Sequence, residues 1–271
     1  KNVEDSGAVL AVAIAAPATV SAEKGIILKA PNVPALDGFR IIAALESELN
    51  LHAILENDAN AAAVGENWMG ASKGFENSIC VTLGTGVGGG IIIKGEVLRG
   101  IDGTAGEIGH ICVEPFGAPC GCGSRGCVEQ YSSATAVVRQ VQELASQYPK
   151  SELAHKARLT SKDVYEAGKN GDELALEVFR RQGFYLGIAL GGLINVLNPE
   201  VIVIGGGAAA GWDLFMPHLQ EQVENRTYRE PRLRAKLQRA VLGDDAGILG
   251  AAKLAFNKLT VEKKAKFISN I

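Results

Sequence analysis

A histidine and three cysteines lie close together in the middle of the chain, around the stretch ICVEPFGAPCGCGSRGCVEQY. They are His110, Cys120, Cys122 and Cys127, with glycines between them. Imidazole and thiolate groups are the ligands of structural zinc sites, and four protein ligands leave no open position for a substrate. Because glycines let a short loop fold back on itself, several thiolates can converge on one ion. The spacing predicts a closed, tetrahedral, structural zinc site.

A redox pair formed by two of these cysteines is the alternative to a metal site, although it would give His110 no role. Five cysteines, an odd number in a chain of 271 residues, do not indicate a disulfide framework and favour a reducing cytoplasm. The two cysteines outside the cluster, Cys80 and Cys112, are expected to be plain buried thiols.

Two carboxylates flank the cluster. Glu107 lies three residues before His110, and Glu129 lies two residues after Cys127. An ion bound by the cluster would hold both carboxylates in one region, where they could hydrogen bond a polyhydroxylated ligand. The alternative is that both are ordinary surface glutamates.

Two glycine-rich turns follow short apolar strands. The first turn, in VTLGTGVGGGIII, contains Gly84, Thr85 and Gly86, and the second, in VIVIGGG, contains Gly205, Gly206 and Gly207. Backbone N–H groups in such turns can approach phosphate oxygens, and nucleotides often bind where a strand leads into a helix, as after the second turn. The first turn matches neither a P-loop nor a dinucleotide-binding fingerprint, because a second strand follows it. An ordinary glycine-rich hairpin is the alternative.

The stretch LENDANAAAVGE places Asn57 and Asp58 where a strand gives way to a helix. Asp58 is expected to be the N-cap of that helix. The same residue could act as a general base, because a carboxylate at a helix N-terminus stays ionised and can accept a hydroxyl proton. The two roles are compatible.

The elements that must position these residues are short strands alternating with helices. Strands are expected within residues 8–15, 25–38, 51–57, 78–83, 89–94, 199–207 and 237–242, the first of them buried on both faces. Helices are expected at residues 38–50, 58–69, 133–147, 161–169, 172–196 and 247–258, with one more after the second glycine turn. This alternation predicts an α/β protein with mixed sheets.

Composition excludes some classes of partner. A net charge of −3 gives no electrostatic reason to expect nucleic acid or an anionic membrane surface. No apolar run approaches the roughly 20 residues that a membrane-spanning helix needs. The apolar stretch near the N-terminus follows Glu4 and Asp5, where a signal peptide would carry basic residues, so a buried strand is the better interpretation.

Taken together, these residues resemble the ROK family of sugar kinases and related sugar-responsive repressors. The matching segments extend over nearly the whole chain and are PN (31–32), ENDANAAAVGE (56–66), TLGTGVGGG (82–90), GEIGH (106–110), CGCGSRGCVE (120–129) and GGG (205–207). The combination of G-E-x-G-H with C-x-C-G-x-x-G-C-x-E is highly specific. Within the family, this version looks most like a glucokinase.

The resemblance implies a two-lobed, ribonuclease H-like fold of the actin, hexokinase and Hsp70 type, with sugar and ATP meeting in the cleft. Residues 1–58 would form the remainder of a small N-terminal lobe, to which a C-terminal helix at about residues 247–271 would return. Residues 59–246 would form the large lobe. The family resemblance also implies a homodimer.

Carried over position by position, the resemblance implies that Asp58 is the general base for the sugar hydroxyl. The side chains implied to hydrogen bond the sugar are Asn32, Asn57, Glu107, His110 and Glu129, with His110 binding zinc as well. The residues implied to meet the phosphates are Gly84, Thr85 and Gly86, and those implied to border the adenosine are Gly205, Gly206 and Gly207. Mg²⁺ is expected to accompany ATP, because phosphoryl transfer depends on charge neutralisation.

Two features depart from the family pattern. An Asp-x-Gly-Gly-Thr turn in an N-terminal β-hairpin is absent, and the first residues match a point well past it, so we expect the sequence to lack an N-terminal piece. The usual Gly-x-Pro-Gly turn near the sugar reads AAPATV here, with Ala18 where glycine is usual. This change would tighten the pocket or shift the substrate preference.

Three functions are compatible with the resemblance. The first is ATP-dependent phosphorylation of a hexose, with glucose converted to glucose 6-phosphate, and Asp58 and the glycine turns favour it. The second is a sugar-responsive transcriptional repressor, which would need an N-terminal helix-turn-helix; the sequence contains no basic recognition helix. The third is a kinase for N-acetylmannosamine, N-acetylglucosamine or fructose, which the residues do not distinguish from a glucose kinase.

Overall fold

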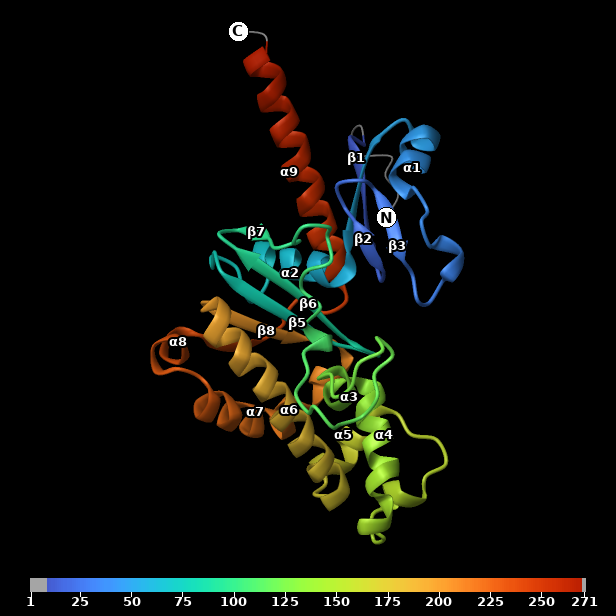
Figure 1. The fold of residues 1–271 in the computed structure, drawn as a ribbon, viewed down its shortest axis with the longest axis vertical. Helices are drawn as coiled ribbons and strands as arrows, with labels where there is room; N and C mark the ends of the chain where they lie inside the picture. Colours follow the sequence, from blue (N-terminus) through green and yellow to red (C-terminus); the bar gives the residue numbers. More distant parts are fainter. Residues whose placement is uncertain (1–8, 270–271) are drawn as a thin grey trace.

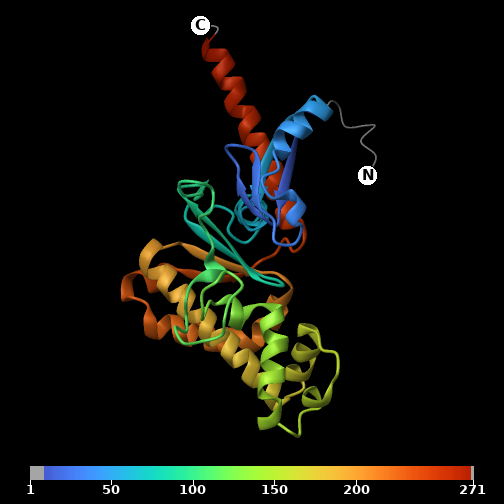
Figure 2. The same cartoon turned by 45° about the vertical axis from the view of Figure 1, so that its right-hand side comes forward.

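The computed structural model of the chain describes residues 9–269. Figures 1 and 2 both show an elongated molecule, with helix α9 (Asp245–Ser269) extending from one end and helices α4 (Ala134–Leu144) and α5 (Ser161–Lys169) at the other. The segment that contains Glu4 and Asp5, and the last two residues of the C-terminal helix expected to reach 271, lie outside the described residues. No helix between residues 9 and 269 has the length and apolarity needed to cross a membrane.

A five-stranded mixed sheet forms the middle of the molecule. In spatial order its strands are β7 (Glu96–Val97), β6 (Val87–Ile93), β5 (Ser78–Leu83), β8 (Val201–Gly205) and β9 (Lys236–Arg239). β5 pairs with β6 in the antiparallel sense and with β8 in the parallel sense. The α/β class and the mixed sheet predicted from the sequence are confirmed. The two glycine turns follow β5 and β8. Because these neighbouring strands are parallel, both turns lie at the same end of the sheet, at the carboxyl ends of the two strands.

A second, smaller group of strands lies beside this sheet (Figure 1). β1 (Ala11–Ala16) pairs in parallel with β4 (His52–Asn57), and β2 (Thr19–Ser21) forms a hairpin with β3 (Ile26–Lys29). Helix α1 (Ile41–Leu49) packs on β3 and β4. Strand β2 was not predicted, because its three residues, which follow Pro17 and Ala18, are too few to show an alternating pattern.

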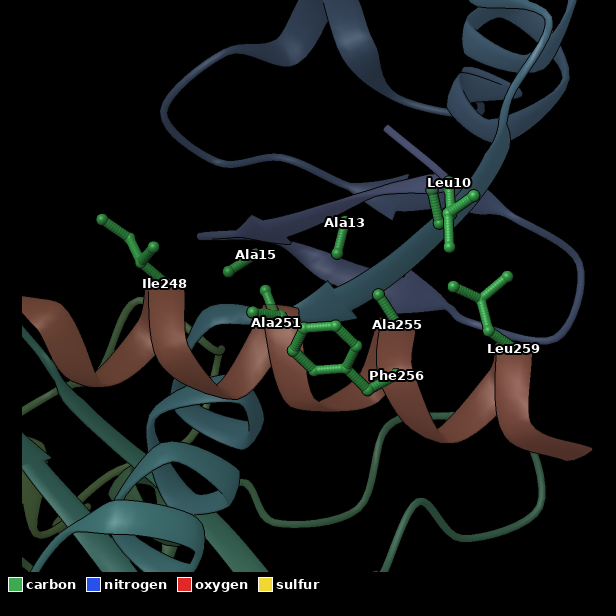
Figure 3. Close-up of a pocket in the computed structure, with 10 residues that line it drawn as sticks. Leu10, Ala13, Ala15, Ile248, Ala251, Ala255, Phe256 and Leu259 are labelled. Atoms are coloured by element: carbon green, nitrogen blue, oxygen red, sulfur yellow. The ribbon is translucent and has the colours of Figure 1, made fainter. Parts of the chain in front are cut away.

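The expectation that the first strand is buried on both faces is wrong. Only the last of the six residues of β1 is buried, and the others are half-buried. Leu10, Ala13 and Ala15 instead line an apolar groove of about 490 Å³, whose other wall is α9 (Figure 3). Among the described residues β1 has one strand partner, β4, so its other edge carries backbone groups that no strand satisfies.

Helix α9 meets helix α2 (Asp58–Met69) and also packs on β1 and β4. The two helices approach so closely that a Cβ on Gly250 would lie 1.7 Å from the carbonyl oxygen of Ala61, and one on Gly65 would lie 2.1 Å from that of Ala246. Only glycine allows this backbone contact. The contact holds the first turn of α9 beside the start of α2.

The helices on the far side of the sheet bury the main hydrophobic core. They are α3 (Glu129–Ser132), α4, α5, α6 (Glu173–Leu197) and α7 (Trp212–Arg226), whereas the short helix α8 (Arg229–Arg234) buries none of its residues. The helix expected at 133–147 is shorter, because α4 ends at Leu144 and continues as a 3₁₀ turn over residues 145–147. Ser133 caps α4 by accepting a hydrogen bond from the N–H of Ala136.

Two glycines of α6 allow a matched test of helix packing. A Cβ on Gly187 would lie 2.6 Å from Cβ of Gln222 on α7, whereas one on Gly192 would have no atom within 4 Å. We expect Gly187→Ala to destabilise the protein by about 1–3 kcal/mol through overpacking. Gly192→Ala is expected to stabilise it by roughly 0.5–1 kcal/mol, because alanine restricts the unfolded chain. Thermal unfolding midpoints of the two variants measure the difference, and equal midpoints would contradict the α6–α7 contact.

Candidate functional site

A cleft of about 680 Å³ gathers nearly all of the predicted site residues. Those that line it are Asn32, Asn57, Asp58, Gly84, Thr85, Gly86, Glu107, His110, Glu129, Gly205 and Gly206. Gly207 is not among the cleft-lining residues and borders a smaller cavity beside α5. Residues separated by more than a hundred positions therefore meet in one cleft.

Asp58 is the first residue of α2 and is exposed to the cleft. Its Oδ1 accepts hydrogen bonds from the N–H of Ala59 at 2.9 Å and from Nδ2 of Asn57 at 3.2 Å. The walls of the cleft withdraw water from the carboxylate and raise its pKa, while these hydrogen bonds oppose the rise. The carboxylate is therefore oriented at the helix start and remains open to a ligand.

The N-cap of α2 is Asn57, and the prediction of Asp58 as the cap is wrong. Oδ1 of Asn57 accepts from the N–H groups of Ala59 at 2.9 Å and Asn60 at 3.1 Å, which are the unpaired donors of the first helical turn. Nδ2 of Asn57 also donates to the carbonyl oxygen of Ala18 at 3.2 Å. This amide thus ties the AAPATV turn to the start of α2, and its contact with the sugar stays a prediction.

Glu107, His110 and Glu129 form one wall of the cleft. Nε2 of His110 lies 3.9 Å from Oε2 of Glu107. Oε2 of Glu129 accepts a hydrogen bond from the N–H of Val87 at 3.1 Å, and a Cβ on Gly86 would lie 2.5 Å from the same oxygen. Glycine at 86 therefore lets the Glu129 carboxylate lie against the first glycine turn.

The cysteines and the histidine predicted to bind metal converge. One ligand atom from each of His110, Cys120, Cys122 and Cys127 lies within 4.8 Å of those of the others. Nδ1 of His110 is 3.7 Å from Sγ of Cys120, and the Sγ atoms of Cys122 and Cys127 are 3.7 Å apart. Three thiols and an imidazole at this spacing fit a divalent ion of zinc type. Since Nε2 of the same histidine faces Glu107, the cluster and the cleft share one side chain.

The cysteine thiols have contrasting acidities. Burial and the neighbouring thiols of Cys120 and Cys122 raise the pKa of Cys127 to about 12, whereas the N–H of Ser124 and a neighbouring thiol lower the pKa of Cys122. Crowding of thiols is the arrangement that a bound cation relieves. Outside the cluster, Cys80 is buried, as expected, but Cys112 is exposed, so the expectation of a buried thiol is wrong for Cys112.

The first glycine turn is held by the start of α4. The N–H of Gly84 donates to the carbonyl oxygen of Gly86 at 2.9 Å, which closes the turn between β5 and β6. The N–H of Ala134 donates to the carbonyl oxygen of Gly84 at 2.8 Å, and Oγ1 of Thr135 donates to that of Thr85 at 2.9 Å. The conformation of the turn is therefore fixed by hydrogen bonds within the protein.

The second glycine turn crosses the end of β5. Gly206 has a φ of +87°, and a Cβ on it would lie 2.5 Å from the carbonyl oxygen of Leu83. A left-handed backbone and a contact this short both require glycine. As a result, the two glycine turns lie next to each other on the floor of the cleft.

One part of the cleft was missed by the sequence analysis. The residues concerned lie between β9 and the first turn of α9 and are Ala240, Gly243, Asp244, Ala246 and Gly247. Glu66, which is 1% exposed, anchors this segment, because its Oε1 accepts from the N–H groups of Val241 and Leu242 at 3.0 and 2.9 Å. A glycine and two aspartates between a strand and a helix, in VLGDDAG, were the available signal.

The fold and the cleft define the actin- and hexokinase-like class of sugar kinases. Within this class, the chain belongs to the ROK family, whose family model matches residues 1–258. A glucokinase from Halalkalibacterium halodurans is 42% identical over 252 residues, which cover 90% of this chain and 76% of that protein.

Solved structures agree with this assignment. A ROK family glucokinase from Streptomyces griseus, crystallised with glucose and AMPPNP, is 35% identical with a TM-score of 0.78, and the match covers 93% of this chain and 83% of that one. A ROK family transcriptional regulator, described as a homologue of the E. coli MLC protein, is 31% identical with a TM-score of 0.84, over 90% of this chain and 61% of that one. The fold by itself therefore does not separate kinases from regulators.

Proposed function

We propose that this protein is an ATP-dependent hexose kinase whose acceptor is glucose and whose product is glucose 6-phosphate. The observation that carries the proposal is that the exposed carboxylate of Asp58 shares one cleft with two glycine turns and a wall of polar side chains. A general base, a phosphate cradle and a sugar wall are the parts that phosphoryl transfer to a hydroxyl needs.

Asp58 would accept the proton of the attacking sugar hydroxyl. A base within hydrogen-bond reach of that proton raises the nucleophilicity of the oxygen as it approaches the γ-phosphate. Its orientation by Asn57 and by its own helix limits the positions that the carboxylate can adopt. Most of the rate enhancement would come from holding the two substrates in line and from excluding water.

The remaining residues would position the two substrates. Asn32, Glu107, His110 and Glu129 would hydrogen bond the sugar hydroxyls, while the N–H groups of the first glycine turn would meet the phosphates. The second glycine turn and the segment before α9 would border the adenosine. Mg²⁺ carried with ATP would supply neutralisation of the phosphate charge.

We further propose that the metal held by the histidine and the three cysteines is Zn²⁺ and that its role is structural. The four ligands would fill a tetrahedral shell, which leaves no open position for a substrate or a water. His110 would bind the ion through Nδ1 and direct Nε2 towards Glu107, in keeping with the distances on its two sides. The ring would thereby be fixed in one tautomer and one orientation.

A panel of sugars tests the proposed substrate. The full-length protein is expected to release ADP with glucose at a higher kcat/KM than with fructose, N-acetylglucosamine or N-acetylmannosamine. The basis for this order is the similarity to a glucokinase that is 42% identical over 90% of this chain. A coupled ADP-release assay measures the four constants, and conversion of the product by glucose 6-phosphate dehydrogenase identifies the phosphorylated position.

ATP without sugar provides the background rate for this panel. A higher kcat/KM for an N-acetylated sugar than for glucose would identify the protein as a kinase for N-acetylmannosamine or N-acetylglucosamine instead. Sugar binding without ADP release from any member of the panel would favour the alternative function, a sugar-responsive regulator, which the similarity to the ROK transcriptional regulator supports.

A further inference from the structure

A buried carboxylate lies two residues before the proposed base along the chain and does not line the cleft. Glu56, the residue before Asn57 at the end of β4, is 2% exposed. Its Oε2 accepts two hydrogen bonds from Arg99, from Nε at 2.9 Å and from Nη2 at 2.7 Å. Neither Glu56 nor Arg99 lines the cleft. The ion pair is therefore outside the reach of the substrates.

The second oxygen of Glu56 is also occupied. Oε1 accepts from the backbone N–H of Asn57 at 3.0 Å and from Nδ2 of Asn60 at 3.1 Å. Asn60 lies in the first turn of α2 and is 1% exposed. The carboxylate thus binds the residues on both sides of Asp58, and Arg99 is its only cationic partner among the described residues. Removing that cation would leave a buried charge uncompensated.

Arg99 belongs to the segment that runs from β7 to Glu107. Its carbonyl oxygen accepts a hydrogen bond from the N–H of Ala105 at 3.1 Å, which closes this segment into a loop. Within the loop, a Cβ on Gly103 would lie 2.6 Å from the carbonyl oxygen of Val20 on β2. The loop therefore packs on the strands of the smaller sheets and ends at the sugar wall.

We propose that Arg99 is a positioning residue, which through Glu56 fixes the strand end that carries Asp58 relative to the loop that carries Glu107. Arg99 and Glu56 are 43 positions apart in sequence. Their ion pair would keep the two sides of the hexose site in a fixed relative position. The proposal rests on the proposed hexose site but not on the identity of the sugar. It assigns Arg99 no contact with substrate.

Three substitutions test this role. Arg99→Met keeps the length of the side chain and removes the charge, while Arg99→Lys restores the charge but offers one donor group in place of the arginine's planar pair. The matched control is Arg180→Met, because Arg180 also donates through Nε and Nη2 to one carboxylate, that of Glu177, but on the surface of α6. The readouts are KM for glucose and for ATP, and the dissociation constant of glucose measured by calorimetry without ATP.

Arg99→Met is expected to raise both the KM and the dissociation constant of glucose by about tenfold or more, since small displacements of binding groups are costly. KM for ATP should change far less, Arg99→Lys should fall between Arg99→Met and the wild type, and Arg180→Met should match the wild type. Glucose constants of Arg99→Met equal to those of the control would overturn the proposal. Equal rises in the KM values for glucose and ATP would also overturn it, because they indicate a general loss of structure.

Glu56→Gln keeps the test decisive if Arg99→Met does not fold. Glu56→Gln removes the negative charge that pairs with Arg99 and changes the shape of the side chain little. We expect the same selective loss of glucose affinity. Unchanged glucose affinity would contradict the positioning role of the ion pair. The dissociation constant of glucose, measured by calorimetry without ATP, also tests the positioning role of Arg99 separately from the proposed kinase function. A wild-type protein that binds glucose without turnover would contradict the kinase function and leave the role of Arg99 testable.

Discussion

Asp58→Asn is expected to lower kcat by about 10²–10⁴-fold, the usual contribution of a general base, with little change in the dissociation constant of glucose. Asparagine is nearly the same size, and its Oδ1 can still accept the hydrogen bond that Oδ1 of Asp58 receives from the N–H of Ala59. The amide has no basic oxygen for the hydroxyl proton. A coupled ADP-release assay gives kcat, and calorimetry gives the glucose affinity.

Asp213→Asn provides a matched control, because Asp213 also lies in the first turn of a helix, α7, away from the cleft-lining residues. It should turn over as fast as the wild type. Full activity in Asp58→Asn would remove Asp58 from the mechanism. Loss of glucose binding together with turnover would instead assign it to substrate binding alone.

The pH dependence of the wild type follows from the same carboxylate. A base must be ionised to act, so kcat/KM should fall as the pH decreases through the raised pKa of Asp58. The raised pKa also means that the folded protein binds this proton more tightly than the unfolded chain does. The resulting stabilisation is complete below the unfolded pKa and is lost as the pH rises through the folded pKa. Asp58→Asn should therefore not destabilise the protein at neutral pH.

Cys127→Ser is expected to abolish metal binding and to raise the KM for glucose by about tenfold or more, as loss of a metal site's supporting groups commonly does. Cys127 is fully buried, and its Sγ lies beside that of Cys122. Without the ion, crowded thiols would no longer hold His110, which faces both Cys120 and Glu107. The sugar wall should loosen, and the thermal midpoint should fall because structural zinc contributes directly to folding.

Elemental analysis of the purified protein measures the metal, with about one ion per chain expected in the wild type. Cys112→Ser is the control, because Cys112 lies in the same loop, is exposed and stands outside the ligand set. It should keep both the metal and the glucose KM. A wild type that contains no metal, or a Cys127→Ser variant with the wild-type metal content, would refute the metal site.

The parts of this site that the sequence predicted are those built from neighbours along the chain. The ligands from His110 to Cys127 fall within one glycine-rich loop, and Asn57 and Asp58 mark one strand-to-helix junction. Local spacing and local propensity decide such features, so a pattern of residue types is enough to find them. The same holds for helix α5, whose predicted range of 161–169 agrees with the structure.

Contacts between distant segments of the chain were decided only by the tertiary structure. The ion pair of Arg99 with Glu56 joins residues 43 positions apart, and the bond from Leu242 to Glu66 spans 176 positions. The half-buried state of β1 and the exposure of Cys112 likewise depend on which other segments cover them. Long-range partners are selected by the packing of the whole chain, in which many weak contacts together outweigh the entropy of closing long loops. Residue types alone do not specify which distant segments pack together. The pairing of Arg99 with Glu56, two residues before the proposed catalytic base, is therefore seen only in the folded structure.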